Sequence, residues 1–170
     1  MVGRVDKLDG RNAIDHWKAN GIDLTALLHR PKVPDNVATC HRKKQDHGLE
    51  KALDHKLIEL GRHAIESGLP AIIELPINNS NRTVGTMLSY EVTKVFGDDG
   101  LPEDTIQIHL KGSAGQSFAA FVNKGITMCL EGDANDYFCK GLSGGRVVVV
   151  PPSESAFESE ENIIIGNVAM

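Results

Sequence analysis

The sequence is poor in cysteine, in aromatic residues and in long apolar runs. Its three cysteines are an odd number without a Cys-x-x-Cys pair, and aromatic residues make up 5% of the chain. Free thiols in a reducing compartment fit this content better than a disulfide framework. We therefore expect a cytoplasmic protein, or one in the stroma of a plastid. No apolar stretch approaches the roughly 20 residues of a membrane helix, and the N-terminus has no apolar segment typical of a signal peptide.

Basic charge is also scarce, since 18 Lys and Arg face 23 Asp and Glu and the formal net charge is −5. Nucleic acids and anionic membranes are bound by concentrated basic surfaces. We therefore expect neither as a partner. The densest basic run, residues 41–44, is followed at once by Gln45 and Asp46, and we interpret it as a solvated loop.

The seven histidines do not have the spacing of a metal site. His47, His55 and His63 are eight residues apart, and eight helical residues advance about 12 Å, so no two of them can share one ion. Cys40 and His41 with His47 form a looser group, but no second pair has metal-site spacing. We expect no metal ligand in this chain.

Catalytic motifs are missing as well. Cys129 lies between two apolar residues, where a thiol is usually an inert packing group, and neither Cys129 nor Cys139 has a histidine nearby in the sequence. Residues 112–115, Gly-Ser-Ala-Gly, lack the Gly-Lys-Ser/Thr end of a phosphate loop, and we interpret them as a corner. We expect no catalytic and no cofactor-binding residue, and no cofactor bound by this chain.

Three segments differ in pattern. Residues 1–47 carry turn signals and two possible short helices, at 13–18 and 24–28. We interpret them as a connecting segment that packs on something else, because several apolar residues lie in it: Ile14, Trp17, Ile22, Leu24, Leu27 and Leu28.

Residues 48–104 predict a helix–strand–helix lead-in. Apolar residues at steps of three and four predict a helix over 48–67, with Asp46 as N-cap and Gly68 as stop. A strand is expected at 71–77, where Pro76 indicates an edge or a bend, then a turn at 78–81 and a second helix that ends at Gly97. The expected helix faces are Leu49, Leu53, Leu57, Leu60 and Ala64, then Val84, Met87, Leu88, Val92, Val95 and Phe96.

Residues 105–170 read as short strands separated by glycine, with apolar strand cores at 105–110, 126–130, 147–150 and 163–165. Gly112 recurs as Gly132, Gly115 as Asn135 and Gly125 as Gly145, with a period of about 20 residues that is typical of repeat architectures. Each unit then holds a corner, a short strand around Phe118 or Phe138, a glycine turn and an apolar strand. The predicted corners are Gly112, Gly115, Gly125, Gly132, Asn135, Gly141, Gly144, Gly145 and Gly166.

Such a repeat predicts a parallel solenoid, because small corner residues let successive coils approach closely. We expect the corner shared by Gly115 and Asn135 to use their tolerance of the left-handed conformation. An antiparallel meander with chance glycines is the alternative. A third copy is expected to begin at Gly166, aligned with Gly132. Because a solenoid needs about three coils and a cap, we expect further residues downstream.

Several motifs resemble one family. Residues 111–117 (Lys-Gly-Ser-Ala-Gly-Gln-Ser), 132–137 (Gly-Asp-Ala-Asn-Asp-Tyr) and 140–145 (Lys-Gly-Leu-Ser-Gly-Gly) resemble the C-terminal domain of the glutamate synthase large subunit, and so do residues 45–49 and 81–89. Residues 2–6 are similar to the segment that leaves its flavin barrel. Cys139 departs from the pattern, which has glycine there, and is expected to crowd one corner.

The resemblance implies a fold and a role. It implies helices and a strand leading into a right-handed parallel β-helix, incomplete at its C-terminus. It also implies a parent enzyme that makes two glutamates from glutamine, 2-oxoglutarate and two electrons, with FMN and an iron–sulfur cluster in its other domains. Partners would be those domains, and a small NAD(P)H-oxidising subunit or ferredoxin.

We therefore interpret the chain as a non-catalytic scaffold fragment of an oxidoreductase, the enzyme being the parent and not the isolated chain. Asn81 and Arg82, between a strand and a helix, are the candidate inter-domain contacts; a helix cap and a surface ion pair are their alternative roles. The rival hypothesis is a stand-alone Gly-repeat β-helix subunit, as in some archaeal synthases or the formylmethanofuran dehydrogenase C subunit.

Overall fold

The computed structural model describes residue 17, residues 25–29 and residues 31–169, and the chain divides into two units, Met1–His47 and Gly48–Met170. In the first unit, α1 (Thr25–Leu28) lies within the predicted helix at 24–28. The predicted helix at 13–18 lies outside the described residues except for Trp17, which is 72% exposed. That this segment packs on another body stays a prediction.

The second unit begins with three short helices: η3 (Leu49–Lys51), α2 (Asp54–Leu60) and α3 (Arg62–Ser67). The prediction of one continuous helix over 48–67 is wrong, because the chain leaves the helical path after Lys51 and again at Gly61. Glycine weakens a helix interior through its backbone entropy. Leu49 and Leu60, expected on the buried face, are 62% and 40% exposed. Asp46 is not the N-cap of this helix, since η3 starts after Gly48.

The next elements follow the sequence closely. Strand β1 (Ala71–Ile77) is an edge of the sheet, as Pro76 predicts. Helix α4 (Thr86–Phe96) ends before Gly97, which is its C-cap and the first residue of the short η4 (Gly97–Asp99). Gly68 and Gly97 have φ of 67° and 59°. Glycine ends helices readily because it adopts positive φ without steric strain. On α4, Leu88 and Val92 are buried, whereas Val95 of the expected face is 55% exposed.

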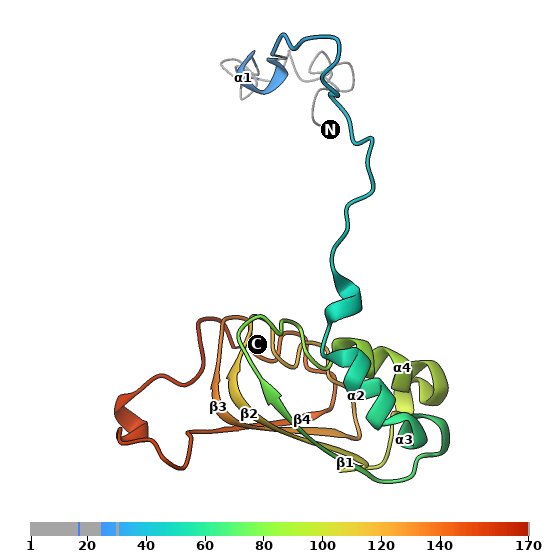
Figure 1. The fold of residues 1–170 in the computed structure, drawn as a ribbon, viewed down its shortest axis with the longest axis vertical. Coiled ribbons are helices and arrows are strands. Elements are labelled where there is room, and N and C mark those ends of the chain that lie inside the picture. Colours follow the sequence, from blue (N-terminus) through green and yellow to red (C-terminus); the bar gives the residue numbers. More distant parts are fainter. Residues whose placement is uncertain (1–16, 18–24, 30, 170) are drawn as a thin grey trace. The chain divides into compact units, whose positions relative to one another are not determined.

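The sheet has four strands in the order β1-β2-β3-β4 and is open at both edges (Figure 1). Its other members are β2 (Ile106–Ala114), β3 (Ile126–Ala134) and β4 (Arg146–Val150). Every neighbouring pair runs parallel. The antiparallel meander is therefore wrong, and the fold mixes helices with a parallel sheet.

The strand register follows the sequence repeat for one pair and slips for the next. β2 pairs with β3 in the register of the repeat (Ile106↔Ile126), whereas β3 pairs with β4 one position short of it (Met128↔Val147). A repeat of 20 residues predicts Val148 as the partner of Met128, and this alignment is wrong by one position. A one-residue slip moves every side chain to the other face, and Val148 is accordingly 41% exposed.

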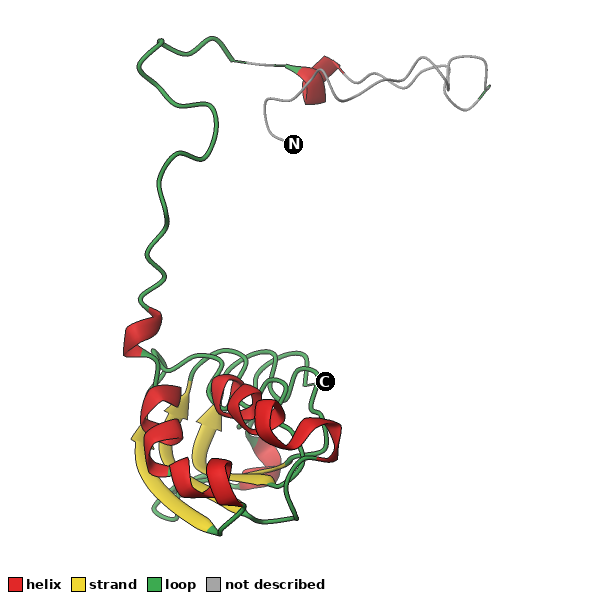
Figure 2. Cartoon of the chain, turned by 90° about the vertical axis from the view of Figure 1, so that its right-hand side faces the viewer, coloured by secondary structure: helices red, strands yellow, loops and turns green. Residues whose placement is uncertain are grey.

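The core lies between the inner face of the sheet and the helices (Figure 2). Its members on the strands stack from coil to coil: Ile106 on Ile126, Ile108 on Met128 and Leu110 on Leu130. All six side chains are at most 1% exposed. The helices contribute Leu57, Ala64, Leu88 and Val92 to this core, and the turns contribute Phe118, Ala119 and Val122. The alternation of apolar residues in β2 and β3 thus results from one buried face.

Three expected strands are turns or irregular. Around Phe118 and Phe138 the chain forms turns, and residues 163–165 make one isolated bridge, Ala134↔Ile165, with Ile163 90% exposed. A further 3-10 turn, η5 (Ser159–Glu161), lies in the exposed excursion at 151–162. In the coils, the strands therefore form one limb and turns form the other. In the first coil, between β1 and β2, α4 takes the place of these turns.

Candidate functional sites: the glycine corners and the open face of the sheet

The corner at Gly112 and Gly132 is set by backbone contact. The two residues are register partners, with φ of 127° and 152°. A Cβ on Gly132 would overlap the Gly112 carbonyl oxygen, and one on Gly112 would overlap the Ile77 carbonyl oxygen. A side chain at either position is therefore excluded by the neighbouring coil. The glycines at this corner are therefore required by the close packing of neighbouring strands.

The second corner contains Gly115, Asn135 and Gly166. The Asn135 N–H donates to the Ala114 carbonyl at 3.2 Å, and Gly166 lies against Asn135 and Asp136. Gly166 therefore takes the repeat position of Asn135 and not that of Gly132, so the predicted alignment of the third copy is wrong. None of the three residues has positive φ. Gly115 and Gly166 are required here by close approach of neighbouring chain, and the predicted use of the left-handed conformation at this corner is wrong.

The third corner contains Gly125 and Gly144, with φ of 96° and 93°. The predicted partner of Gly125 was Gly145, and the difference again reflects the missing residue before β4. Gly145 is confined by packing instead, since its Cβ would lie 2.5 Å from a methyl group of Val122. The Gly125 Cβ would overlap the side chain of Leu101.

In the turns between the corners, every second residue has positive φ. Ser117, Ala119 and Phe121 have φ of 60°, 60° and 58°; their counterparts in the next repeat, Tyr137, Cys139 and Gly141, have 59°, 56° and 62°. Non-glycine residues are strained there by about 1–2 kcal/mol each. Cys139, where the family resemblance has glycine, is 7% exposed and carries this strain. Burial raises the pKa of its thiol to about 11.

A buried aspartate that the sequence did not point to holds the start of α4. Asp54 is 2% exposed. The Gly85 N–H donates to both of its carboxylate oxygens at 3.0 Å, and the N–H groups of Met87 and Leu88 donate to Oδ1 at 2.9 and 3.1 Å. Burial raises the pKa of Asp54, while these amides oppose the rise. All three donors belong to the far end of the helix–strand–helix segment, so no local capping pattern could have shown this contact.

The candidate inter-domain contacts have different surroundings. Asn81 is used within the coil: its Oδ1 accepts the Asn78 N–H at 2.9 Å and its carbonyl accepts the Gly115 N–H at 3.1 Å. It caps a turn and not a helix. Arg82 is exposed, and within the described residues its guanidinium has no hydrogen bond or ion pair. Within that part of the chain, Arg82 therefore does not form the surface ion pair that was its alternative role.

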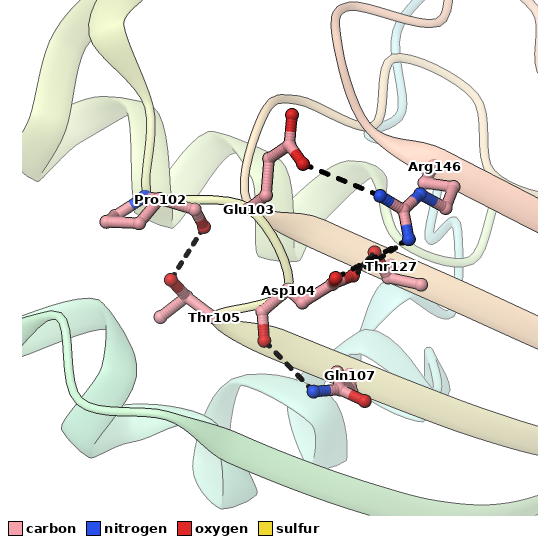
Figure 3. A network of polar contacts seen from close by, with 7 residues as sticks. All are labelled: Pro102, Glu103, Asp104, Thr105, Gln107, Thr127 and Arg146. Carbon is pink, nitrogen blue, oxygen red and sulfur yellow. Dashed lines mark hydrogen bonds and ion pairs between the residues drawn. The ribbon is translucent and has the colours of Figure 1, made fainter.

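An exposed polar network joins the loop before β2 to β3 and β4 (Figure 3). Arg146 lies 3.6 Å from a Glu103 oxygen and 3.4 Å from an Asp104 oxygen, and the Thr127 hydroxyl donates to Asp104 at 2.6 Å. Asp104 has φ of 57°. The network ties three successive coils together at one end of the sheet.

The outer face of the sheet is not covered by the helices of this unit. There the register places Glu74, His109 and Cys129 side by side on β1, β2 and β3. In the next row the Lys111 ammonium lies 2.8 Å from a Glu131 oxygen, which lowers the pKa of the Glu131 carboxyl. These residues line a hollow of about 590 Å³.

Cys129, interpreted from its apolar neighbours as an inert packing thiol, does not lie in the buried core. Cys129 is half-buried and lines this hollow. Its histidine neighbour, His109, is distant in sequence, but it occupies the position of Cys129 in the preceding repeat. The repeat therefore contained the signal.

No three His, Cys, Asp or Glu side chains gather closely enough to hold a metal ion within residues 25–29 and 31–169. Among the helices of the described segments, none has the length and apolarity needed to cross a membrane.

Stacked glycine corners on a parallel sheet define a glycine-rich repeat domain. A family model described as the GXGXG motif matches residues 54–170, and the chain belongs to this family. The matched range includes the buried Asp54, all three corners and the open face of the sheet.

Relatives agree with the resemblance noted in the sequence. The chain is 49% identical over 172 residues to a glutamate synthase (NADH) of Saccharomyces cerevisiae, a match that covers 98% of the chain and 8% of that protein. It is 47% identical over 171 residues to the glutamate synthase (NADPH) large chain of Bacillus subtilis, covering 99% and 11%. Ferredoxin-dependent glutamate synthase 2 of Synechocystis is 35% identical, covering 100% and 11%. The chain thus spans about a tenth of the length of these relatives.

Proposed function

We propose that the chain is a non-catalytic structural part of a glutamate synthase large subunit, and that its coils form a β-helix that holds the other domains in position. The parent reaction would convert glutamine, 2-oxoglutarate and two electrons into two glutamates. FMN and an iron–sulfur cluster would be bound by other domains, and the enzyme would act in the cytoplasm or in a plastid stroma.

The observation that carries the proposal is the 49% identity over 98% of the chain, combined with the in-register parallel strands. The stacked Gly112 and Gly132 support a β-helix, because their carbonyl contacts require coils placed directly on one another. The bridge Ala134↔Ile165 supports a further coil beyond β4.

The electron donor is proposed to be chosen elsewhere in the parent. Matching segments that are 35–49% identical to this chain occur in proteins named for NADH, NADPH and ferredoxin. Since one scaffold serves all three, contact with the small NAD(P)H-oxidising subunit or with ferredoxin is assigned to other domains. Within this chain, Arg82 is the better candidate for an inter-domain contact, because Asn81 is already used inside its coil.

A chimera tests the proposal. Residues 54–170 would replace the matching segment of the Bacillus subtilis large chain, and glutamine-dependent oxidation of NADPH by the assembled enzyme would be measured. We expect turnover close to that of the unmodified enzyme. In the same chimera, a triple variant with Glu74→Gln, His109→Asn and Cys129→Ser should retain turnover, because these are the titratable groups that share one row in the hollow.

Two results would contradict a scaffold role. One is an assembled, flavin-loaded chimera without turnover; the other is loss of turnover in the triple variant with assembly unchanged. Arg82→Ala should lower the melting temperature of the assembled chimera while it leaves that of the isolated chain unchanged. Equal effects on both would remove Arg82 as an inter-domain contact.

A further inference from the structure

The row formed by Glu74, His109 and Cys129 places a carboxylate, an imidazole and a thiol on three adjacent parallel strands. Neighbouring strands are about 4.8 Å apart, and side chains at matched register positions point to the same face. His109 therefore stands between the other two. This order allows the imidazole to take the thiol proton while the carboxylate stabilises the imidazolium.

The hollow beside this row can admit a small molecule. It measures about 590 Å³, and part of its lining is apolar: Leu75, Pro76, Leu110 and Val150. The charged and titratable groups that face it are Glu74 from β1, His109 and Lys111 from β2, and Glu131 from β3. Lys111 and Glu131 are paired with each other at 2.8 Å. His109 is thus the titratable neighbour placed in the register of the thiol.

We propose that Cys129 is a site of S-thiolation, at which a low-molecular-weight disulfide transfers one of its halves to the protein. The Cys129 sulfur gives its proton to His109 and attacks one sulfur of the disulfide. The disulfide S–S bond breaks as the new S–S bond to Cys129 forms. The second sulfur leaves as a thiolate and takes the proton from His109, so the small disulfide is the two-electron oxidant and no other reactant is needed.

The other cysteines of the chain make the site selective. Cys139 is 7% exposed and burial raises the pKa of its thiol from 9.0 to about 11. The raised pKa lowers the thiolate share of Cys139 near neutral pH, and the thiolate is the reactive form. Cys40 is exposed and belongs to the first unit, whereas the lining of the hollow comes from the second unit. Substitution of Cys40 therefore leaves one reactive thiol for measurement.

The test uses the full chain with Cys40→Ser and follows thiol exchange with Ellman's disulfide. We expect one thiol per chain to react fast, and Cys129→Ser to remove that phase. His109→Asn should slow the phase about threefold to tenfold, since the proton acceptor is lost. Incubation with glutathione disulfide should give one adduct per chain by intact mass, absent in Cys129→Ser.

Matched variants separate proton transfer from mere exposure. His41→Asn, an exposed histidine of the first unit, should leave the rate unchanged. Glu74→Gln should slow the reaction less than His109→Asn does. If His109→Asn lowers the melting temperature, the rate of Glu74→Gln provides a second test of proton transfer. The proposal is overturned if Cys129 reacts no faster than Cys139. It is also overturned if neither His109→Asn nor Glu74→Gln changes the rate, or if glutathione disulfide gives no adduct.

Discussion

Removal of the Asp54 carboxylate should destabilise the second unit strongly. In Asp54→Ala, the N–H groups of Gly85, Met87 and Leu88 lose their acceptor at the start of α4. Loss of a helix N-cap costs about 1–2 kcal/mol, and each buried donor left without a partner costs about 1–3 kcal/mol. Met87 is only partly buried, so water can reach its amide. We expect a loss of about 3 kcal/mol in the free energy of unfolding.

The measurement is urea unfolding of the full chain followed by far-UV circular dichroism, because the only tryptophan, Trp17, lies in the first unit. Asp35→Ala, an exposed aspartate of the first unit, serves as the matched control and should change stability by less than about 0.5 kcal/mol. Asp54→Asn keeps one acceptor oxygen in place and should lose less than Asp54→Ala. A loss below about 1 kcal/mol in Asp54→Ala would refute the assignment of Asp54 as the anchor of α4.

Three further results are expected. Burial raises the pKa of Asp54 above 3.8, so the folded state holds this proton more tightly than the unfolded state. The stability of the wild type relative to Asp54→Asn should therefore fall as pH rises from about 3.8 through the raised pKa. A gain in relative stability over that pH interval would contradict this prediction. Gly132→Ala should cost about 3 kcal/mol or more through overlap with the Gly112 carbonyl. The control Gly48→Ala has open space and a left-handed φ of 62°, and should cost about 1 kcal/mol. Equal urea midpoints for the two variants would argue against close stacking. Arg146→Ala should lower the free energy of unfolding by less than about 1 kcal/mol, because the ion pairs of the network in Figure 3 are exposed. Salt at about 1 M should abolish this loss. A loss of stability that salt does not change would indicate packing instead.

The sequence predicted those parts of the fold that depend on local pattern. Gly112 and Gly132 showed how β2 and β3 align, and Gly68 and Gly97 marked the helix ends. The helix over 48–67 was overpredicted because leucines at steps of three and four occur both in one continuous helix and in a series of short helices. Leu49 and Leu60 are exposed since the chain leaves the helical path between them.

The site residues were predicted less well because they meet through the register and not through the sequence. Asp54 binds amides of Gly85 and Leu88, which lie beyond β1 in the chain. Cys129 was judged by its neighbours Met128 and Leu130, which point to the opposite face of β3. A strand alternates faces, so a thiol between two core residues must point away from the core. Applied together, the alternation and the repeat would have paired Cys129 with His109.

The excursion at 151–162 has a consequence for how such coils can be lengthened. On β3, Met128 is paired with Val147 before the excursion, and Ala134 is paired with Ile165 after it. More residues separate Ala134 from Ile165 than separate Met128 from Val147, and the difference equals the length of the excursion. The chain therefore leaves the stack after β4 and returns to it before the corner at Gly166. Successive coils thus need to agree in the positions of their corners and not in their number of residues. The end of β4 is accordingly a natural graft point, where foreign peptides could be displayed without disturbing the stacked core.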